Sequence, residues 1–497
     1  MLRTRGSRRR GALGATTIGL IALLLGGCQW TLRIPLPSQL LDDGIDETET
    51  DVRHPSISAD GRYVVYEGAQ KEGGIGPGEP PPFSSRDLYL RDQSTGTSSR
   101  LGPGLEPSLD GSGRFLAFSR AGRIYRRDLQ TGAEAAVTPA SGVAYEPAIS
   151  GNGTVVAFTS TATNLVAGDT NGQPDVFVKD MVTGTLRLVS ATGAGASGNG
   201  PSTAASVSSD GRYVAFASDA TNLVAGKTGV FVRDVVAGTT AAVAAGAEPS
   251  ISGDGRRVAF TSFAGLVAGD VDGRQDVYVA DPVAGLSVVS THDAAPEWAS
   301  FAPSLSADGQ TVAYEAARWF EICEDDVCHE QLATRDVYVH HLPSGAIAKV
   351  SQSTVSPTIA GGSADADLTS DGRFVAFASG AGSLVPGDTN RTTDIYLHTG
   401  IEVAASSISP ASAARGSSAT LTVTGRAFAP GSKISVAGDG VTIVSTTYVS
   451  PTTLRAQITV AATAPVGARA VSVEVPGLGP GAQIPSIVVS SSSLTIT

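Results

Sequence analysis

Three stretches of the chain place oxygen-bearing side chains at alternate positions around a tight turn, the ligand arrangement of calcium-binding loops. They read LVAGDTNGQPD at 165–175, LVAGDVDGRQD at 266–276 and LVPGDTNRTTD at 384–394. The candidate ligands are Asp169, Asn171, Asp175, Asp270, Asp272, Asp276, Asp388, Asn390 and Asp394. The twelfth-position glutamate of an EF-hand is missing, and capping of an ordinary surface loop explains the same residues. Calcium and turn capping therefore both stay open, and the sequence requires no cofactor.

A second set of titratable residues recurs at one place in a repeated phrase. The phrase PSISGDGRRVAFTS at 249–262 has seven versions, and one position lies six residues before the turn aspartate or its equivalent. That position holds His54, Glu106, Glu146, Ala204, Glu248, Ala302 and Asp365. Acidic groups and a histidine gathered at one place could bind a cation or a cationic group, or shift one another's pKa values. The alternative is a solvated acidic rim.

The repeat itself indicates the fold. Each unit contains a short strand, an Asp-Gly turn, a second strand, a loop of variable length and a third strand such as DVFVKD at 175–180. Most units then show a Thr-Gly-like or Ala-Gly turn and a fourth strand, so the chain reads as four antiparallel strands repeated seven times. This pattern predicts a seven-bladed β-propeller over residues 45–403. We expect residues 31–36, TLRIPL, to supply the fourth strand of the last blade.

The repeats resemble the TolB-type propeller repeat, which is related to the WD-repeat family. The resemblance implies the fold but no single function, because this repeat serves receptors, scaffolds, peptidases and lyases. The segment 404–497 lacks the repeated Asp-Gly phrase and has several alternating strand patterns instead. It resembles an IPT/TIG-type immunoglobulin-like domain through Pro410, Gly416, Gly425 and Phe428. The predicted fold class is thus all-β, a seven-bladed propeller followed by a small immunoglobulin-like β-sandwich.

The N-terminus reads as a targeting segment. MLRTRGSRRR precedes an apolar run that ends in Leu-Gly-Gly-Cys at 25–28, which resembles a bacterial lipobox. We therefore expect a signal peptide at 1–27, a lipidated Cys28 and a linker at 28–44. Gln29 after the cysteine points to the outer membrane in the lipoprotein family. An ordinary secretory signal is the alternative.

The remaining cysteines, Cys323 and Cys328, stand in the stretch EICEDDVCHE. Outside the cytoplasm, two cysteines this close together in a loop are expected to form a local disulfide. The alternative is a metal site with the neighbouring His329, but one histidine beside this spacer supplies no second ligand pair of the zinc-site type.

In a four-stranded antiparallel blade the loop between strands two and three opens on one face of the propeller, and the Asp-Gly turns open on the other. The long insertions fall on the first of these faces, so we expect binding there. Four third strands carry a basic residue before an aspartate, for which we expect local pairing of solvated charges. These basic residues are Arg91, Arg127, Lys179 and Arg233.

Composition limits the partners. The formal net charge is −12, and loss of residues 1–27, which hold five arginines and no acidic residue, takes it to −17. Such a surface repels phosphate backbones, so nucleic acid is excluded. The motifs Gly-x-Ser-x-Gly, His-Glu-x-x-His and Gly-x-x-x-x-Gly-Lys are missing. The prediction is a lipid-anchored binding or scaffold protein of the cell envelope that recognises a protein, peptide or glycan. A metal-assisted polysaccharide lyase, or another carbohydrate-active propeller enzyme, is the alternative.

Overall fold

A computed structural model describes most of the chain from residue 39 onward. The described residues are 39–41, 51–69, 86–139, 142–268, 270–290, 298–324, 327–351, 362–382, 384–385, 392–399, 404–426, 428, 431–450, 452–476, 483–488 and 493–497. Their regular elements are all β-strands, and no helix in this part of the chain has the length and hydrophobicity of a membrane span.

Between residues 39 and 399, the described chain forms seven sheets with a four-strand path each, which we call blades one to seven. Their innermost strands are β2 (Asp51–Ile57), β6 (Leu105–Leu109), β10 (Ala144–Ile149), β14 (Ser202–Val207), β18 (Ala247–Ile251), β22 (Trp298–Leu305) and β27 (Ser363–Leu368). The second strands are β3 (Tyr63–Ala69), β7 (Phe115–Arg120), β11 (Val155–Ser160), β15 (Tyr213–Ser218), β19 (Val258–Ser262), β23 (Thr311–Glu324) and β28 (Phe374–Ser379). The third strands are β4 (Arg86–Asp92), β8 (Arg123–Asp128), β12 (Asp175–Asp180), β16 (Gly229–Asp234), β20 (Asp276–Asp281), β25 (Asp336–His341) and β29 (Asp394–Thr399). The outermost strands are β5 (Thr97–Pro103), β9 (Glu134–Ala136), β13 (Leu186–Leu188), β17 (Thr239–Ala244), β21 (Gly285–Val288), β26 (Ala346–Lys349) and, in blade seven, β1 (Gln39–Leu40).

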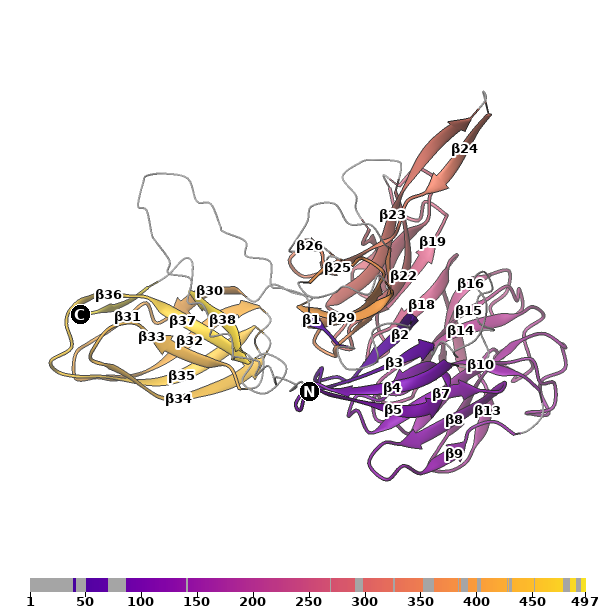
Figure 1. Ribbon diagram of the computed structural model, residues 1–497, viewed down its shortest axis with the longest axis horizontal. Coiled ribbons are helices and arrows are strands. Elements are labelled where there is room, and N and C mark those ends of the chain that lie inside the picture. Colours follow the sequence, from indigo (N-terminus) through magenta and orange to yellow (C-terminus); the bar gives the residue numbers. More distant parts are fainter. Residues whose placement is uncertain are drawn as a thin grey trace, which may run out of the picture. The chain divides into compact units, whose positions relative to one another are not determined.

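The blades close into a ring. Each innermost strand contacts the innermost strands of the two neighbouring blades, and β27 of blade seven contacts β2 of blade one. Figure 1 follows this course from indigo to orange. Because β1 pairs with β29, blade seven combines both ends of the propeller segment. The propeller therefore includes part of the segment 28–44 that we expected to be a linker, whereas the predicted closing strand at 31–36 lies outside the described residues.

An aromatic pair lies in the core of every blade. Each pair joins facing residues of the second and third strands, with ring centroids 5.7–5.8 Å apart and the planes stacked. The pairs are Tyr66–Tyr89, Phe118–Tyr125, Phe158–Phe177, Phe216–Phe231, Phe260–Tyr278, Tyr314–Tyr338 and Phe377–Tyr396. Such pairs contribute about 0.5–1.5 kcal/mol beyond the burial of their area, which accounts for the aromatic position in the repeated phrase.

The rest of the phrase encodes the turn between the first two strands. In blade one the hydroxyl of Ser58 donates to Asp60 at 2.7 Å and accepts the N–H of Tyr63 at 3.0 Å. The same Asp60 oxygen accepts the N–H of Arg62 at 3.0 Å. Gly61 follows with φ 77°, a left-handed conformation that glycine adopts without strain. The serine, aspartate and glycine of the phrase are thus explained by local hydrogen bonding.

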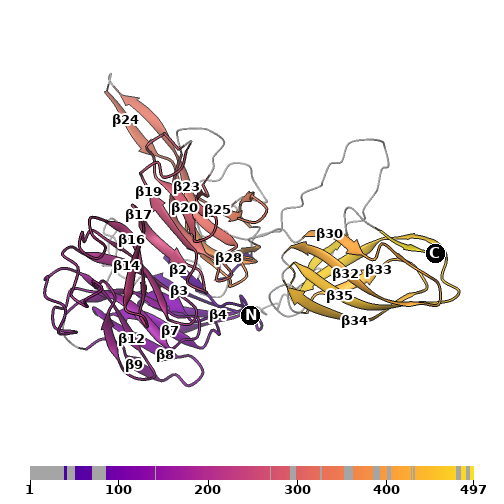
Figure 2. The same cartoon turned by 180° about the vertical axis from the view of Figure 1, so that it is seen from behind.

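Blade six carries a projecting β-hairpin. β23 extends beyond its blade and pairs with β24 (Val327–Leu332), and both views show this hairpin standing clear of the other strands (Figures 1 and 2). Cys323 lies directly opposite Cys328 in the backbone register. The two cysteines that we expected in a loop are therefore on paired strands.

The C-terminal segment forms three further sheets. The first contains β30 (Ala404–Ser409), β32 (Ser418–Arg426), β35 (Thr453–Val460) and β34 (Val441–Ser450). The second contains β31 (Ser412–Ala413), β39 (Leu494–Ile496) and β36 (Gly467–Arg469), and the third contains β33 (Lys433–Val436), β37 (Val471–Pro476) and β38 (Gln483–Val488). Phe428 is fully buried in the core that these sheets share, with Leu421 and Val471 among its members. The segment is an immunoglobulin-like β domain that holds together on apolar packing.

Candidate functional site

The two faces of the propeller differ in construction. We call the side with the Asp-Gly turns the turn face, and the side with the loops between second and third strands the second-loop face. On the turn face, seven backbone hydrogen bonds of 2.8–3.2 Å link consecutive blades in a closed ring. They run from Ala59 to Gly111, Gly111 to Gly151, Asn152 to Ser209, Ser209 to Gly253, Gly253 to Ala307, Asp308 to Ser370 and Ser370 to Ala59, donor first. Main-chain bonding of this kind leaves the turn face uniform.

The aligned residues His54 to Asp365 form a ring around the channel on the opposite side, which we call the mouth ring. All seven have left-handed backbone conformations, with φ between 46° and 57°. Each lies where the pairing of its innermost strand with the second strand shifts register, a β-bulge. Alanine and glutamate adopt this conformation only at a cost, so the surrounding structure must hold it.

The acidic members of the mouth ring hold the next blade. Glu106 accepts the backbone N–H of Glu146 at 3.0 Å, and Glu146 accepts that of Ala204 at 3.1 Å. Glu248 accepts the N–H of Ala302 at 2.9 Å, and Asp365 accepts that of His54 at 3.1 Å. The carboxylates are thus distributed around the ring, each facing the next blade, and no three acidic or histidine side chains of the described mouth ring gather closely enough to share a metal ion.

Two buried glutamates complete the ring where an acid is missing from it. In blade one, which has His54, Glu67 of β3 accepts the N–H of Glu106 at 2.7 Å. In blade six, which has Ala302, Glu315 of β23 accepts the N–H of Asp365 at 2.9 Å. Their side chains are only 1% and 2% exposed, and Arg335 lies 2.7 Å from Glu315. Blade four has alanine at both positions, Ala204 and Ala217, and offers no carboxylate to blade five.

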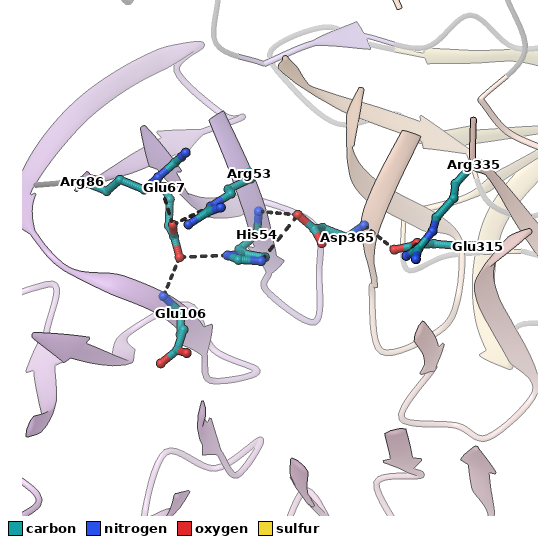
Figure 3. Close-up of polar contacts among 8 residues, drawn as sticks. All are labelled: Arg53, His54, Glu67, Arg86, Glu106, Glu315, Arg335 and Asp365. Carbon is teal, nitrogen blue, oxygen red and sulfur yellow. Dashed lines mark hydrogen bonds and ion pairs between the residues drawn. The ribbon is translucent and has the colours of Figure 1, made fainter. Parts of the chain in front are cut away.

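His54 joins blades seven and one in the most densely charged part of the ring (Figure 3). Its Nδ1 lies 2.9 Å from Glu67, and its Nε2 lies 3.7 Å from Asp365. Burial lowers the pKa of His54, but the hydrogen bond to Glu67 and the charges of Asp365 and Glu67 outweigh burial and raise the pKa above 6.5. Burial raises the pKa of Glu67, but His54, the N–H of Glu106 and Arg53 outweigh it and lower that pKa.

A channel of about 540 Å³ runs along the innermost strands and is lined by residues of all seven blades. Ser56, Ser108, Ser206 and Ser250 each accept a backbone N–H from the next blade, at 2.9–3.1 Å. Asp367 takes this role in blade seven and accepts the N–H of Ile57 at 2.9 Å, and burial raises its pKa. The channel wall therefore uses its polar groups mainly to join the blades.

The second-loop face has a hollow at blade five, beside the connection that leads into it from blade four. It has a volume of about 370 Å³ and is lined by Ala245, Gly246, Ala247, Thr261, Ser262, Phe263, Ala264 and Gln275. Phe263 is 70% exposed, an unusual fraction for an aromatic side chain. The mouth ring adjoins the hollow, because Thr261 donates a hydrogen bond to the exposed Glu248 at 3.3 Å. An apolar surface and a carboxylate thus lie next to each other.

The candidate calcium ligands fall on the second loops of blades three and five. Asp270, Asp272 and Asp276 bring one carboxylate oxygen each to within 4.8 Å of one another. Asp169 and Asp175 are both buried, and Asn171 donates to Asp175 at 2.8 Å. In the third copy Asp394 begins β29 and is 2% exposed, whereas Asp388 and Asn390 lie outside the described residues. Cys28, the expected lipidation site, also lies outside them.

Two basic residues of the third strands, Arg127 and Arg233, have partners other than the aspartates that follow them. Arg127 and Arg233 instead donate to backbone carbonyls of the preceding blade, Leu101 at 2.7 Å and Ala191 at 3.0 Å. The aspartates are paired with arginines that precede the second strands: Arg62 with Asp92, Arg114 with Asp128 and Arg212 with Asp234, at 2.8–2.9 Å. The expected local pairing was wrong because neighbouring strand residues point to opposite faces of the blade.

Sequence reasoning missed Glu67, Glu315 and the hollow beside Phe263. A signal for the two glutamates was present: of the seven second strands, only those of blades one and six carry an acid at that position, and both blades lack one in the mouth ring. The hollow had no such signal, because it depends on the small residues Ala245 to Ala247, at the entry to blade five, lying beside the second loop of that blade.

Comparison with known proteins agrees with the two-part architecture. Residues 405–495 match the family model of the IPT/TIG domain. A search of characterised proteins by sequence gave no match. Among solved structures, the chain is similar to a putative TolB from Agrobacterium tumefaciens (15% identity, 51% of this chain and 83% of that chain covered, TM-score 0.36). It is also similar to TolB from Acinetobacter baumannii (18%, 63% and 84%, 0.35) and to the β-propeller domain of the Trilobed protease from Pyrococcus furiosus (10%, 71% and 96%, 0.46). The closed ring of seven sheets and the family match define the class, a β-propeller protein with a C-terminal IPT/TIG domain, and the similarity to solved structures carries no function.

Proposed function

We propose that the protein is a binding or scaffold protein that holds a protein or peptide partner on the second-loop face of its propeller. The observation that carries the proposal is Phe263, an exposed aromatic residue beside a hollow of about 370 Å³ lined by small residues. Exposed apolar surface next to a concave site is typical of interaction sites.

The chemistry of the site favours a particular kind of partner. The hollow accepts an apolar side chain, and Glu248 of the mouth ring lies beside its wall through Thr261. A peptide with an apolar residue next to a basic one would match both features. Glycan recognition is the competing outcome, since an exposed aromatic ring also stacks on sugars.

A display library of random peptides, selected on the full chain, tests this proposal. We expect enriched peptides with apolar and basic residues, whose binding is lost in Phe263→Asp. Val283→Asp is the matched control, because Val283 is 94% exposed on the turn face of the same blade. Peptides that bind wild type and Phe263→Asp equally, or a library that yields none while a glycan array gives ligands, would contradict a peptide site here.

We further propose that Cys28 is lipidated and anchors the protein to the outer membrane, with the IPT/TIG domain as a spacer or second docking module. Metabolic labelling with a fatty acid tests the anchor. The wild type should be labelled and Cys28→Ala should not. Equal labelling of both proteins would contradict the anchor.

The enzyme alternative makes a separate prediction. If the mouth ring belonged to a polysaccharide lyase, His54→Ala and Glu146→Gln would abolish turnover of an oligosaccharide without lowering the melting temperature. The hydrogen bond of Glu146 to the next blade and that of His54 to Glu67 within blade one support a structural role instead. A screen of oligosaccharide substrates with the wild type distinguishes a catalytic from a structural role of the mouth ring, because turnover is expected only for the catalytic role.

A further inference from the structure

An aspartate stands at or next to the start of the third strand in several blades, and in blades one, three, five and six it contacts a residue on the fourth strand or just after it. In blades three, five and six this aspartate accepts a hydrogen bond from a serine hydroxyl: Ser190 to Asp175 at 2.5 Å, Ser290 to Asp276 at 2.7 Å and Ser351 to Asp336 at 2.9 Å. Three blades thus hold the same aspartate by the same serine contact, which makes their remaining contacts comparable.

Blades one and six neutralise this aspartate with a basic side chain of the fourth strand. Lys349 lies 2.6 Å from Asp336, and Arg100 lies 2.6 Å from Asp87, the corresponding residue of blade one. In the strand register, Lys349 and Arg100 face the third-strand tyrosines, Tyr338 and Tyr89. A cation on the fourth strand thus pairs with this aspartate in two of the blades.

Blades three and five have no such cation and have extra acids instead. The residues in the register position of Lys349 are Leu188 in blade three and Val288 in blade five. Their second loops add Asp169 in blade three, and Asp270 with Asp272 in blade five. Among the described residues, no Lys, Arg or His forms an ion pair with any acid of either loop. The second loops of blades three and five thus add negative charge near the aspartate that blades one and six pair with a basic side chain.

Asp169 is a buried acid of the second loop of blade three. The residue is 5% exposed, and its carboxylate oxygens form no close hydrogen bond among the described residues; the N–H of Asn171 and the carboxylate of Asp175 are its polar neighbours. A buried carboxylate without partners is strongly unfavourable. It faces Asp175, whose two carboxylate oxygens accept hydrogen bonds from Ser190 and Asn171.

The loop of blade five repeats this geometry. Asp272 accepts the N–H of Arg274 at 2.9 Å, as Asn171 accepts that of Gln173 at 2.8 Å in blade three. Asp276 accepts the hydroxyl of Ser290 at 2.7 Å and brings a carboxylate oxygen to within 4.8 Å of those of Asp270 and Asp272. The hydroxyl of Tyr278 contacts both Asp270 and the carbonyl of Ala264, a residue of the hollow, and has one hydrogen to donate between them. The acidic loop therefore forms part of the wall beside Phe263.

We propose that the second loops of blades three and five each bind a calcium ion, held by Asp169, Asn171 and Asp175 and by Asp270, Asp272 and Asp276. The ion takes the place that Lys349 occupies in blade six. All the side-chain ligands are oxygens on loops, which suits the larger and more flexible coordination sphere of Ca²⁺ better than the compact octahedron of Mg²⁺. Asn171 contributes its side-chain oxygen once its amide turns, which exchanges its present hydrogen bonds to Asp175, to the carbonyl of Gly198 and from the N–H of Gln173 for contact with the ion.

Calcium titration of the metal-free full chain by calorimetry tests the proposal. At least two ions should bind per chain, and saturating calcium should raise the melting temperature by about 5 °C relative to a chelator. Magnesium at the same concentration should raise it much less. Absence of calcium binding to the wild type would overturn the proposal, because this measurement needs no variant to fold.

Two kinds of variant separate a calcium site from a structural role. Asp169→Asn with Asp270→Asn should lose most of the calcium response while leaving the chelated protein as stable as wild type or more so, because the substitutions remove repulsion. Val288→Lys should copy the Lys349–Asp336 pair and abolish the response of blade five. Asp219→Asn, the same charge change in the second loop of blade four, is the control and should respond like wild type. If the double variant lost the same stability with and without calcium, the carboxylates would be ordinary turn caps.

Discussion

One carboxylate oxygen of Glu106 lies 3.0 Å from the backbone nitrogen of Glu146, so a side chain of blade two accepts a hydrogen bond from the main chain of blade three. The same relation recurs around the mouth ring except at blade four, and Glu67 and Glu315 supply the carboxylate in blades one and six, where the aligned residue is not acidic. The acidic series is therefore explained first by the joining of blades. Its partly exposed carboxylates then give the second-loop face its negative charge.

Truncation of a mouth-ring acid should destabilise the propeller. Glu146→Ala leaves the N–H of Ala204 and the hydroxyl of Thr159 without an acceptor, and should cost about 1–2 kcal/mol in the free energy of unfolding. Glu146→Gln should cost far less, because a single oxygen accepts both hydrogen bonds and the amide retains one. Chemical denaturation measures both. Equal losses in the two variants would show that charge, and not the hydrogen bond, is what matters.

The same reasoning predicts a gain of stability in blade four. Ala204→Glu introduces a carboxylate at the junction that lacks one, and its backbone already has the conformation that the other glutamates adopt. We expect the free energy of unfolding to rise by about 0.5–1 kcal/mol, because the new carboxylate accepts one ordinary hydrogen bond from the N–H of Glu248. Ala217→Ser, on the neighbouring second strand, is a control without a carboxylate. A loss of stability in Ala204→Glu would contradict the assignment of the ring as a set of blade-to-blade contacts.

The propeller repeat, its turns and the C-terminal domain could be predicted from the sequence because each depends on local patterns. Ser58, Asp60 and Gly61 act within one turn, and the aromatic pairs follow from strand alternation. The closing strand could not be placed, because two residues, Gln39 and Leu40, carry no periodicity and are defined by a partner more than 350 residues away. The role of the mouth ring could not be predicted either, because neither glutamate nor alanine is typical of a residue with a left-handed backbone conformation at a β-bulge.

Closure of the ring should depend on the N-terminal strand. Leu41, next to β1, is fully buried in a cluster with Val52 of blade one and Ile395 of blade seven. Leu41→Ala should destabilise the propeller by about 2–4 kcal/mol, the usual range for a buried leucine. Val283→Ala, at a residue that is 94% exposed, is the control and should be neutral within about 0.5 kcal/mol. A neutral Leu41→Ala in denaturation experiments would argue against ring closure at this position.

Stability should depend on pH through His54. Because its pKa is raised from 6.5 in the folded protein, its contribution is complete below pH 6.5 and disappears as the pH rises through the raised value. The difference in melting temperature between wild type and His54→Gln should therefore be larger at pH 5.5 than at pH 9. In a Glu67→Gln background most of this pH dependence should vanish, since Glu67 supplies the hydrogen bond. A difference in melting temperature that grows as the pH rises would contradict the raised pKa of His54.

The hairpin cysteines should form a disulfide, because Cys323 and Cys328 face each other in the backbone register. A thiol-reactive probe added to unfolded protein should label both cysteines only after reduction. Reduction should leave the melting temperature of the propeller nearly unchanged, since the bridge closes a loop within one hairpin and constrains little of the unfolded chain. Labelling without reductant would contradict the disulfide.

The central claim is that the partner binds on the second-loop face, and site-specific photo-crosslinking tests it most directly. A photoreactive amino acid is placed at Phe263 or Val271 on that face, and at Val236 or Val283 on the turn face, in cells that naturally make the protein. All four residues are 70–94% exposed, so the probes are matched in accessibility. The account predicts a discrete adduct from Phe263 and Val271 and none from Val236 and Val283. Adducts from the turn-face positions alone would contradict it.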